Sequence, residues 1–394
     1  MSSSNRVRVA VIKESVYGTT PAAGSFDTLR FTSESLSGTP ETTESQSIRS
    51  DRLSSGQVVT GLTVSGDVNF ELAKEDAIDL MLESAMHNTW VADTPVAVDL
   101  TIAASAGTLT RGAGSFVSDG VVVGDFLQLT DFTNSANNVQ VMVIDVVALV
   151  VTFVGPATIV DETGSGTSYN VLDKLSIGTS KISLSVEKSF GDLTNKAINY
   201  TGAIASNLNV TMNYGEIANG SVSFMANGYD PVDAAADFMT YTRTINAAAT
   251  TNSLNGSVDM PFIASSLIGS LDEVTFCIQS VEISLNNNLT PQTCIGEVAP
   301  VDYSSGTAQI EISLSAYLAD ANWASLAKKL SQESFALGFM VKNVDGYYAF
   351  YLPAVQVSFD DPASAGQNQD IILDMSGTAK VGANGESSLT IYRS

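Results

Sequence analysis

Leu62-Thr-Val-Ser-Gly-Asp-Val-Asn-Phe-Glu-Leu72 is the stretch that decides the fold, because polar and apolar residues alternate along it almost without a break. In an extended strand, successive side chains point to opposite faces. The stretch therefore predicts a strand that packs on a core with one face and meets water with the other. The polar face carries Thr63, Ser65, Asp67, Asn69 and Glu71, and the apolar face carries Val64, Val68, Phe70 and Leu72.

The same two-residue period recurs through the chain and outweighs helical periodicity. It is found at 182–187, 208–213, 281–285 and 310–318. Helical spacing of apolar residues predicts only two helices, at 75–86 and 321–330, and each follows one of the best alternating strands. The expected fold class is all-β with two flanking helices.

The order of these elements repeats, which indicates duplicated architecture. A strand, a long polar loop, a strand, a helix and three further strands occur once within 28–94 and 173–230, and again within 266–394. We therefore expect two β-sandwich or barrel domains, joined by a linker at 231–265 and preceded by an N-terminal arm at 1–27.

Residues 95–172 interrupt the first copy. This segment reads as short strands between glycine-rich turns such as Arg111-Gly-Ala-Gly114, a composition typical of a small β-barrel or sandwich. Insertions are usually tolerated at solvent-facing loops. We expect an outward decoration domain whose removal, at 97–170, leaves assembly intact.

Composition excludes several classes of protein. Among 394 residues, 42 are acidic and 18 basic, giving a net charge of −24, and such a field repels nucleic acid and anionic membranes. No apolar run approaches the roughly 18 residues of a membrane span, and the N-terminus lacks the apolar region of an export signal. Two cysteines, Cys277 and Cys294, are too few for a disulfide framework. We expect buried thiols, while leaving open whether the two are paired.

A search for catalytic chemistry finds no positive evidence, so we expect a protein that is not an enzyme and has no cofactor or metal. The single histidine, His87, ends the first predicted helix, and no metal-ligand or phosphate-loop spacing is present. Paired carboxylates of a glycosidase stay open, because acids are plentiful and their geometry is not given by the sequence.

Several segments together resemble the major tail tube proteins of long-tailed, non-contractile bacteriophages. They are Ile12–Ala22, Leu29–Leu36, Glu41–Ser45, Ile48–Arg52, Val64–Leu72, Val186–Phe190, Gly202–Asn207, Gly220–Met225, Ser284–Leu289 and Ile312–Tyr317. The resemblance covers nearly the whole chain except 95–172. It implies self-assembly into stacked rings that form a tube in the virion, through which DNA passes during ejection. It also implies a tape measure protein and tail-end proteins as partners, and synthesis in the cytoplasm of a bacterial host.

Combined with the repeat, the resemblance predicts a ring of three chains with pseudo-sixfold symmetry. The candidate lumen-facing acids on polar strand faces are Asp67, Glu71, Glu187 and Glu311, with Glu282 less clearly placed. Loops 37–58 and 287–305 are the candidate contacts with the next ring, and the first contains Glu41, Glu44, Arg49, Asp51 and Arg52. Deleting 42–54 should leave a folded chain that cannot polymerise. The alternatives are a capsid decoration or tail fibre protein, and a carbohydrate-binding β-sandwich.

Overall fold

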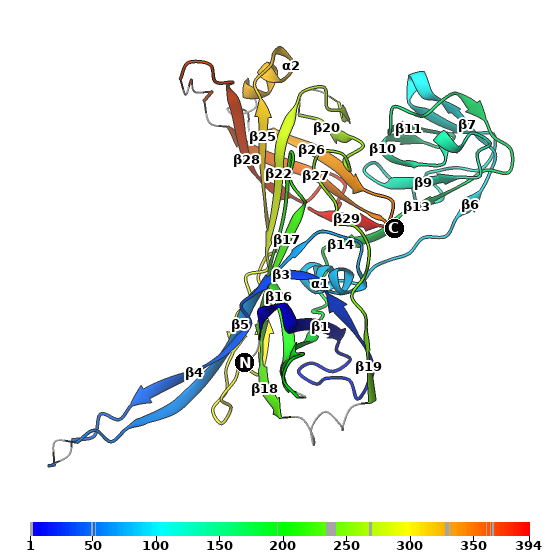
Figure 1. Ribbon diagram of the computed structural model, residues 1–394. Helices are drawn as coiled ribbons and strands as arrows, with labels where there is room; N and C mark the ends of the chain where they lie inside the picture. Colours follow the sequence, from blue (N-terminus) through cyan, green and yellow to red (C-terminus); the bar gives the residue numbers. More distant parts are fainter. Residues whose placement is uncertain are drawn as a thin grey trace.

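A computed structural model describes residues 3–394, except 49, 52, 195, 234–241, 268–269, 328–330, 332, 360, 363 and 365. Nineteen of the described strands join into one hydrogen-bonded network, and eight others form a separate sheet. The chain is strand-rich with two α-helices among the described residues, which confirms the expected all-β class. A long hairpin, β4–β5, extends away from the body (Figure 1).

The first part of the large network and its helix precede the insertion. Its elements are β1 (Val7–Lys13), β2 (Ala23–Leu29), β3 (Phe31–Glu34), β4 (Ser37–Glu44), β5 (Gln57–Glu71) and α1 (Asp76–Met86). After the insertion follow β14 (Asp173–Ser176), β15 (Leu184–Phe190), β16 (Lys196–Asn213), β17 (Asn219–Ala226), β18 (Gly228–Asp233) and β19 (Thr242–Asn246).

The C-terminal part follows and has the second helix between its strands. It contains β20 (Ile263–Ser265), β21 (Asp272–Glu273), β22 (Ile278–Asn286), β23 (Thr290–Gln292), β24 (Asp302–Ser304), β25 (Gln309–Tyr317), α2 (Asp320–Trp323), β26 (Ser334–Lys342), β27 (Tyr347–Phe359), β28 (Ile372–Lys380) and β29 (Thr390–Arg393). Of these, β23 and β24 pair only with each other among the described strands.

The two parts share an order of strand pairing. In the first, β3 and β4 pair with β5, β5 with β17, β17 with β16, and β16 with β15. In the second, β22 pairs with β25, β25 with β28, β28 with β27, and β27 with β26. Antiparallel pairing of β16 with β22 joins both sets into one continuous sheet.

A bulge also recurs at the equivalent place in each part. Leu184 pairs with Ala203 and Val186 with Tyr200, so an advance of two residues along β15 lies opposite an advance of three residues along β16. Phe335 pairs with Val355 and Leu337 with Leu352, again two steps against three. Because a bulge bends its strand, β16 and β27 each turn from one sheet layer into the other. These bulges supply a register for aligning the two parts.

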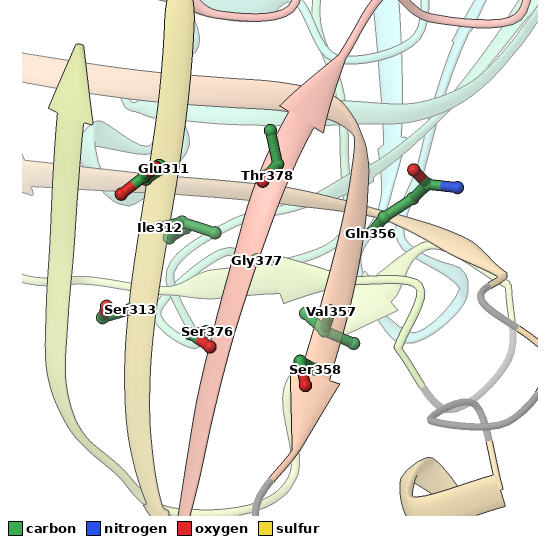
Figure 2. A pocket seen from close by; sticks show the side chains of 9 residues that line it. All are labelled: Glu311, Ile312, Ser313, Gln356, Val357, Ser358, Ser376, Gly377 and Thr378. Carbon is green, nitrogen blue, oxygen red and sulfur yellow. The ribbon is translucent and has the colours of Figure 1, made fainter. Parts of the chain in front are cut away.

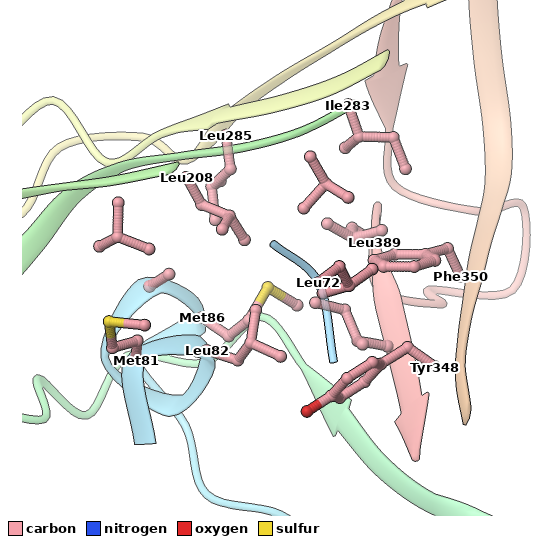
Figure 3. Close-up of a cluster of buried hydrophobic side chains, with 14 of the residues drawn as sticks. Leu72, Met81, Leu82, Met86, Leu208, Ile283, Leu285, Tyr348, Phe350 and Leu389 are labelled. Atoms are coloured by element: carbon pink, nitrogen blue, oxygen red, sulfur yellow. The ribbon is translucent and has the colours of Figure 1, made fainter. Parts of the chain in front are cut away.

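Helix α1 packs under the continuous sheet and closes its core. Met81, Leu82 and Met86 lie beneath Leu208 and Leu285 of the sheet (Figure 3). The predicted helix at 75–86 is therefore confirmed. The second helix is shorter than predicted: α2 ends at Trp323, a 3₁₀ turn covers Ala324–Ala327, and residues 328–330 lie outside the described residues. Trp323, at the end of α2, is 62% exposed.

The N-terminal segment is not a free arm. Strand β1 pairs with both β15 and β2, and its Val9 and Val11 are buried. Beyond it, Glu14 is 9% exposed, and its carboxylate accepts hydrogen bonds from Ser185 Oγ (2.7 Å) and the Gly202 amide (2.9 Å). Residues 14–20 therefore pack on β15 and β16, while β1 adds a strand beside β15 in the same sheet.

The expected linker is also largely tied to the body. Strand β18 pairs with β16, β19 runs parallel to β2, and β20 pairs with β26. Leu254 is fully buried in the main core, and its amide donates to the Leu72 carbonyl (2.8 Å).

The insertion forms the eight-stranded sheet, but it does not stand apart as a decoration. Its strands are β6 (Val96–Ala97), β7 (Leu100–Ala103), β8 (Thr108–Arg111), β9 (Phe126–Thr130), β10 (Gln140–Val147), β11 (Val150–Val154), β12 (Glu162–Thr163) and β13 (Ser168–Val171). Its hydrophobic core is shared with Phe262, Met340, Tyr351 and Tyr392 of the C-terminal part. The module therefore covers the sheet formed by β26, β27 and β29, beside which Figure 1 shows it.

A buried polar contact fixes this docking. Asp125 of the insertion is 1% exposed and accepts a hydrogen bond from the Tyr392 hydroxyl at 3.0 Å. Burial raises the pKa of Asp125 above its usual range. At Gly338 of β26, a Cβ atom would lie 2.4 Å from Cε of Met142, so the two surfaces meet without space for a side chain.

Candidate functional site: the polar wall and the hairpin arm

Seven neighbouring strands present one uninterrupted polar face, which we call the polar wall. In order across the sheet the strands are β5, β17, β16, β22, β25, β28 and β27. One transverse row runs Glu71, Asn219, Thr211, Glu282, Ser313, Ser376 and Ser358, and the next runs Asn69, Ser221, Asn209, Ser284, Glu311, Thr378 and Gln356. The residues between them on each strand point into the core.

Four of the five proposed lumen acids lie on the polar wall. Asp67 and Glu311 are exposed, while Glu71 and Glu282 are half-buried. Glu71 accepts a hydrogen bond from Ser253 Oγ (2.5 Å), and Glu282 accepts one from Asn209 Nδ2 (2.8 Å). The alternation in the sequence had placed these side chains on one face of each strand, and the register brings the faces together.

Glu187 is a correction, because its side chain is fully buried. Alternation along 182–187 had indicated a wetted face, but β15 is covered on both faces. Its polar side lies under the N-terminal segment, where Thr20 Oγ1 contacts Ser185 Oγ at 2.9 Å. Arg8 of β1 forms an ion pair with Glu187 at 3.5 Å. This acid is a buried structural group of the chain.

Asp374 is an acid of the wall that sequence reasoning missed. It is exposed on β28 opposite Ser315, whose hydroxyl donates to its carboxylate. The signal was available, because Ile372-Leu-Asp-Met-Ser-Gly-Thr-Ala-Lys380 alternates like the other strands. With it, the described wall residues hold five carboxylates against one ammonium group, that of Lys380.

A shallow hollow lies in the wall over β28, beside Gly377. Figure 2 shows Glu311 and Ser313 on β25, Ser376 and Thr378 on β28, and Gln356 on β27 around it. A Cβ atom on Gly377 would lie 2.8 Å from the Gln356 carbonyl oxygen, so a side chain there would crowd the neighbouring strand. Among the described strands, β28 therefore lies in tight contact with β27.

The hairpin arm, residues 37–65, is the second feature of the site. Residues 37–44 of β4 pair with 57–65 of β5. Glu41 and Glu44 accept hydrogen bonds from Thr63 Oγ1 (2.7 Å) and Ser54 Oγ (2.9 Å), which stiffen the hairpin. Asp51 is exposed near the tip, whereas Arg49 and Arg52 lie outside the described residues. The other proposed loop residues thus lie along the arm.

Loop 287–305, in contrast, folds back onto the body. It contains the β23–β24 hairpin, and the Leu62 amide at the base of the arm donates to the Val298 carbonyl at 2.8 Å. Lys181 forms an ion pair with Asp302 at 2.6 Å. Both cysteines, Cys277 and Cys294, are free and exposed, which corrects the expectation of buried thiols.

Comparison with known proteins identifies the type of assembly. The sequence model of a family described as phage tail tube protein matches residues 4–379, nearly the whole chain. The chain belongs to the phage tail tube protein family. No curated protein matches it in a sequence search. As a tail tube protein it is a structural component of a bacteriophage virion tail.

The single histidine of this tail tube protein is buried at the end of a helix. His87 has a left-handed backbone (φ 49°) at the end of α1 and is 4% exposed. Burial, followed by the nearby Lys181 ammonium, lowers the pKa of His87. Among the described residues no group of three or more His, Cys, Asp or Glu could hold a metal ion, and no helix is long and apolar enough to span a membrane.

Proposed function

We propose that this chain assembles into stacked rings whose polar walls join to line the channel of a phage tail tube. The observation that carries the proposal is the continuity of the wall across both parts of the chain through the β16–β22 ladder. A sheet with one apolar face packed on a core and one polar face of small side chains suits the inner surface of a hollow assembly. Its two units are 28–94 with 173–230, and 266–394, joined by 231–265 and carrying the module at 95–172.

The register of the repeat supports a tilted barrel. Aligning the two bulges makes Ala205 equivalent to Val357. The pairings lead from Ala205 through β17 to Gly66 and from Val357 through β28 to Ile312, so the next residues, Asp67 and Ser313, are also equivalent. The row through Asp67 reaches β25 at Gln309, four strands away and four residues before Ser313. A shift of four residues over four strands, with a rise of about 3.3 Å and a spacing of about 4.8 Å, gives a tilt of about 35°. Closed barrels use this range of tilt.

The same geometry supports three chains per ring. Besides the seven wall strands, β3 and β4 pair one after the other along β5 and count as an eighth strand. Each chain then contributes two units of four strands, so three chains give 24 strands and a backbone diameter of about 45 Å at this tilt. Two chains give 16 strands and a backbone diameter of about 30 Å, and side chains pointing inward from opposite sides narrow the open channel to about the width of duplex DNA. Three is then the smallest ring that leaves clearance around the duplex.

The acidic wall has a physical role in this proposal. During ejection the DNA passes a surface with carboxylates at Asp67, Glu71, Glu282, Glu311 and Asp374, which repel phosphates and prevent adhesion. No catalysis is required. The assembly partners are other copies of the chain, a tape measure protein in the lumen and tail-end proteins at the termini, after synthesis in the cytoplasm of a bacterial host.

The experiment is electron microscopy of the purified protein with mass measurement of the rings. We expect hollow tubes with three chains per ring. A monomer that never polymerises, or rings of six full chains, would contradict the proposal. A Glu282→Lys, Glu311→Lys variant should still form tubes, because the wall side chains do not support the core, but those tubes should retain DNA in a filter-binding assay at low salt.

A further inference from the structure

A groove runs along the base of the hairpin arm, between β5 and the β23–β24 hairpin. It has a volume of about 520 Å³. Apolar side chains supply much of its lining: Leu62, Met225, Pro291, Ile295, Val298 and Tyr303. Ile295 is 108% exposed and Val298 54% exposed, so this apolar surface is uncovered in the single chain. Glu41 and Glu297 add negative charge to it.

The tip of the arm, residues 45–56, has chemistry that fits such a groove. Ile48 is 102% exposed and Leu53 is 65% exposed. The tip contains two arginines and one aspartate, a net charge of +1, in a chain whose net charge is −24. An apolar and basic segment is complementary to an apolar groove bearing carboxylates, which provides both burial and charge attraction.

The arm itself separates its tip from its own groove. Residues 42–44 of β4 lie between Glu41 of the groove and the tip, a length of about 10 Å, and Figure 1 shows the hairpin directed away from the body. Each chain therefore carries one tip and one groove that must find partners elsewhere. A tip-to-groove contact between copies is heterologous, and such contacts extend into open or closed assemblies rather than stopping at a dimer.

We propose that the tip of one copy's arm occupies the groove of a neighbouring copy. The inference rests on the self-assembly proposed above and goes further by naming the receptor for the arm. Burying Ile48 and Leu53 against Ile295 and Val298 covers four exposed apolar side chains of the described chain. Cys294, a free exposed thiol of the groove, provides a natural probe.

The test uses the full chain with Cys277→Ser, which leaves Cys294 as its one thiol. In assembled tubes, Cys294 should react with a maleimide at least tenfold more slowly than in the unassembled chain. Introducing one cysteine at Ser47, Ser50, Ser54 or Ser55 should give, for at least one position, intermolecular disulfides after mild oxidation. Removing Cys294 as well, by Cys294→Ser, is the matched control and should abolish those bands.

A substitution in the groove gives a second readout. Ile295→Asp changes a fully exposed side chain, so the chain should fold but lose tube formation. Val344→Asp, 90% exposed in the turn before β27, is the control and should form tubes normally. If the parent protein never forms tubes, the proposed function fails. If tubes form while Cys294 stays as reactive as in the free chain and no tip cysteine crosslinks, self-assembly stands and this inference is overturned. That second result would also be expected of an arm that binds DNA instead.

Discussion

Removing the inserted module should make the chain unfold or aggregate, because the module shares a hydrophobic core with the C-terminal part. The perturbation is deletion of residues 97–170 with a short glycine-serine join. The cut is geometrically mild, because the Val91 amide already donates to the Lys174 carbonyl at 2.9 Å and holds the two ends together. Loss of stability would therefore come from the surface left behind and not from a strained connection.

The magnitude follows from the side chains that the module covers. Phe262, Met340, Tyr351 and Tyr392 are at most 7% exposed within the shared core. Exposing four large apolar side chains at about 1.5–3 kcal/mol each costs about 6–12 kcal/mol. Whole domains are stable by about 5–15 kcal/mol, so the deletion removes most or all of the stability of the C-terminal part.

The assay combines soluble yield, binding of a hydrophobic dye and urea unfolding. We expect insoluble or dye-binding protein from the deletion. The same deletion with Met340→Ser, Tyr351→Ser and Tyr392→Ser should recover solubility, because the uncovered face is then polar. A deletion protein without these serines whose free energy of unfolding lies within about 2 kcal/mol of the parent's, and which forms normal tubes, would contradict this prediction.

Two further predictions concern groups buried around α1. Asp79 accepts hydrogen bonds from Tyr348 Oη (2.8 Å) and Arg393 Nη1 (2.7 Å), which join the helix to the last strands. Asp79→Ala should lower the free energy of unfolding in urea by about 3–5 kcal/mol, whereas Asp76→Ala, at an exposed position, should lower it by under about 0.5 kcal/mol. Equal losses would contradict this role of Asp79. For His87, the folded chain disfavours the proton, so stability should decline as pH falls below about 6.5, where the unfolded chain gains it. His87→Asn, which tolerates the left-handed backbone, should show a smaller loss between pH 7.5 and 5.5 than the parent; an unchanged loss would exclude His87 as the cause.

Alternation predicted the wall well because it is a local property of each strand. Asp67, Glu282 and Glu311 needed only the two-residue period to be placed on polar faces. Which strands lie side by side, and hence that these acids share one surface, depends on the β16–β22 ladder between distant segments. No local pattern contains that register.

Two predictions were wrong, the exposure of Glu187 and the separate position of the insertion, because both depend on contacts between segments far apart in the chain. Glu187 alternates correctly, yet it is buried beside β1, a neighbouring strand from about 180 residues earlier in the chain whose Arg8 forms an ion pair with it. For β26 the signal was present but unused: all seven residues of Phe335–Val341 are buried, and an unbroken apolar run is typical of a strand covered on both faces. That run indicated a second covering layer, which the insertion supplies.

The two units solve the same packing problem with different parts of the chain. In the first, the segment with Glu14 and Thr20 packs against β15; in the second, the insertion covers β26 and β27. Their long loops also differ: 37–65 extends as an arm, while 287–305 folds back and forms the groove beside it. An arm on one unit and a groove on the other cannot be interchanged. A ring of three such chains then has sixfold symmetry only in its wall, and the arms reduce the whole assembly to threefold symmetry.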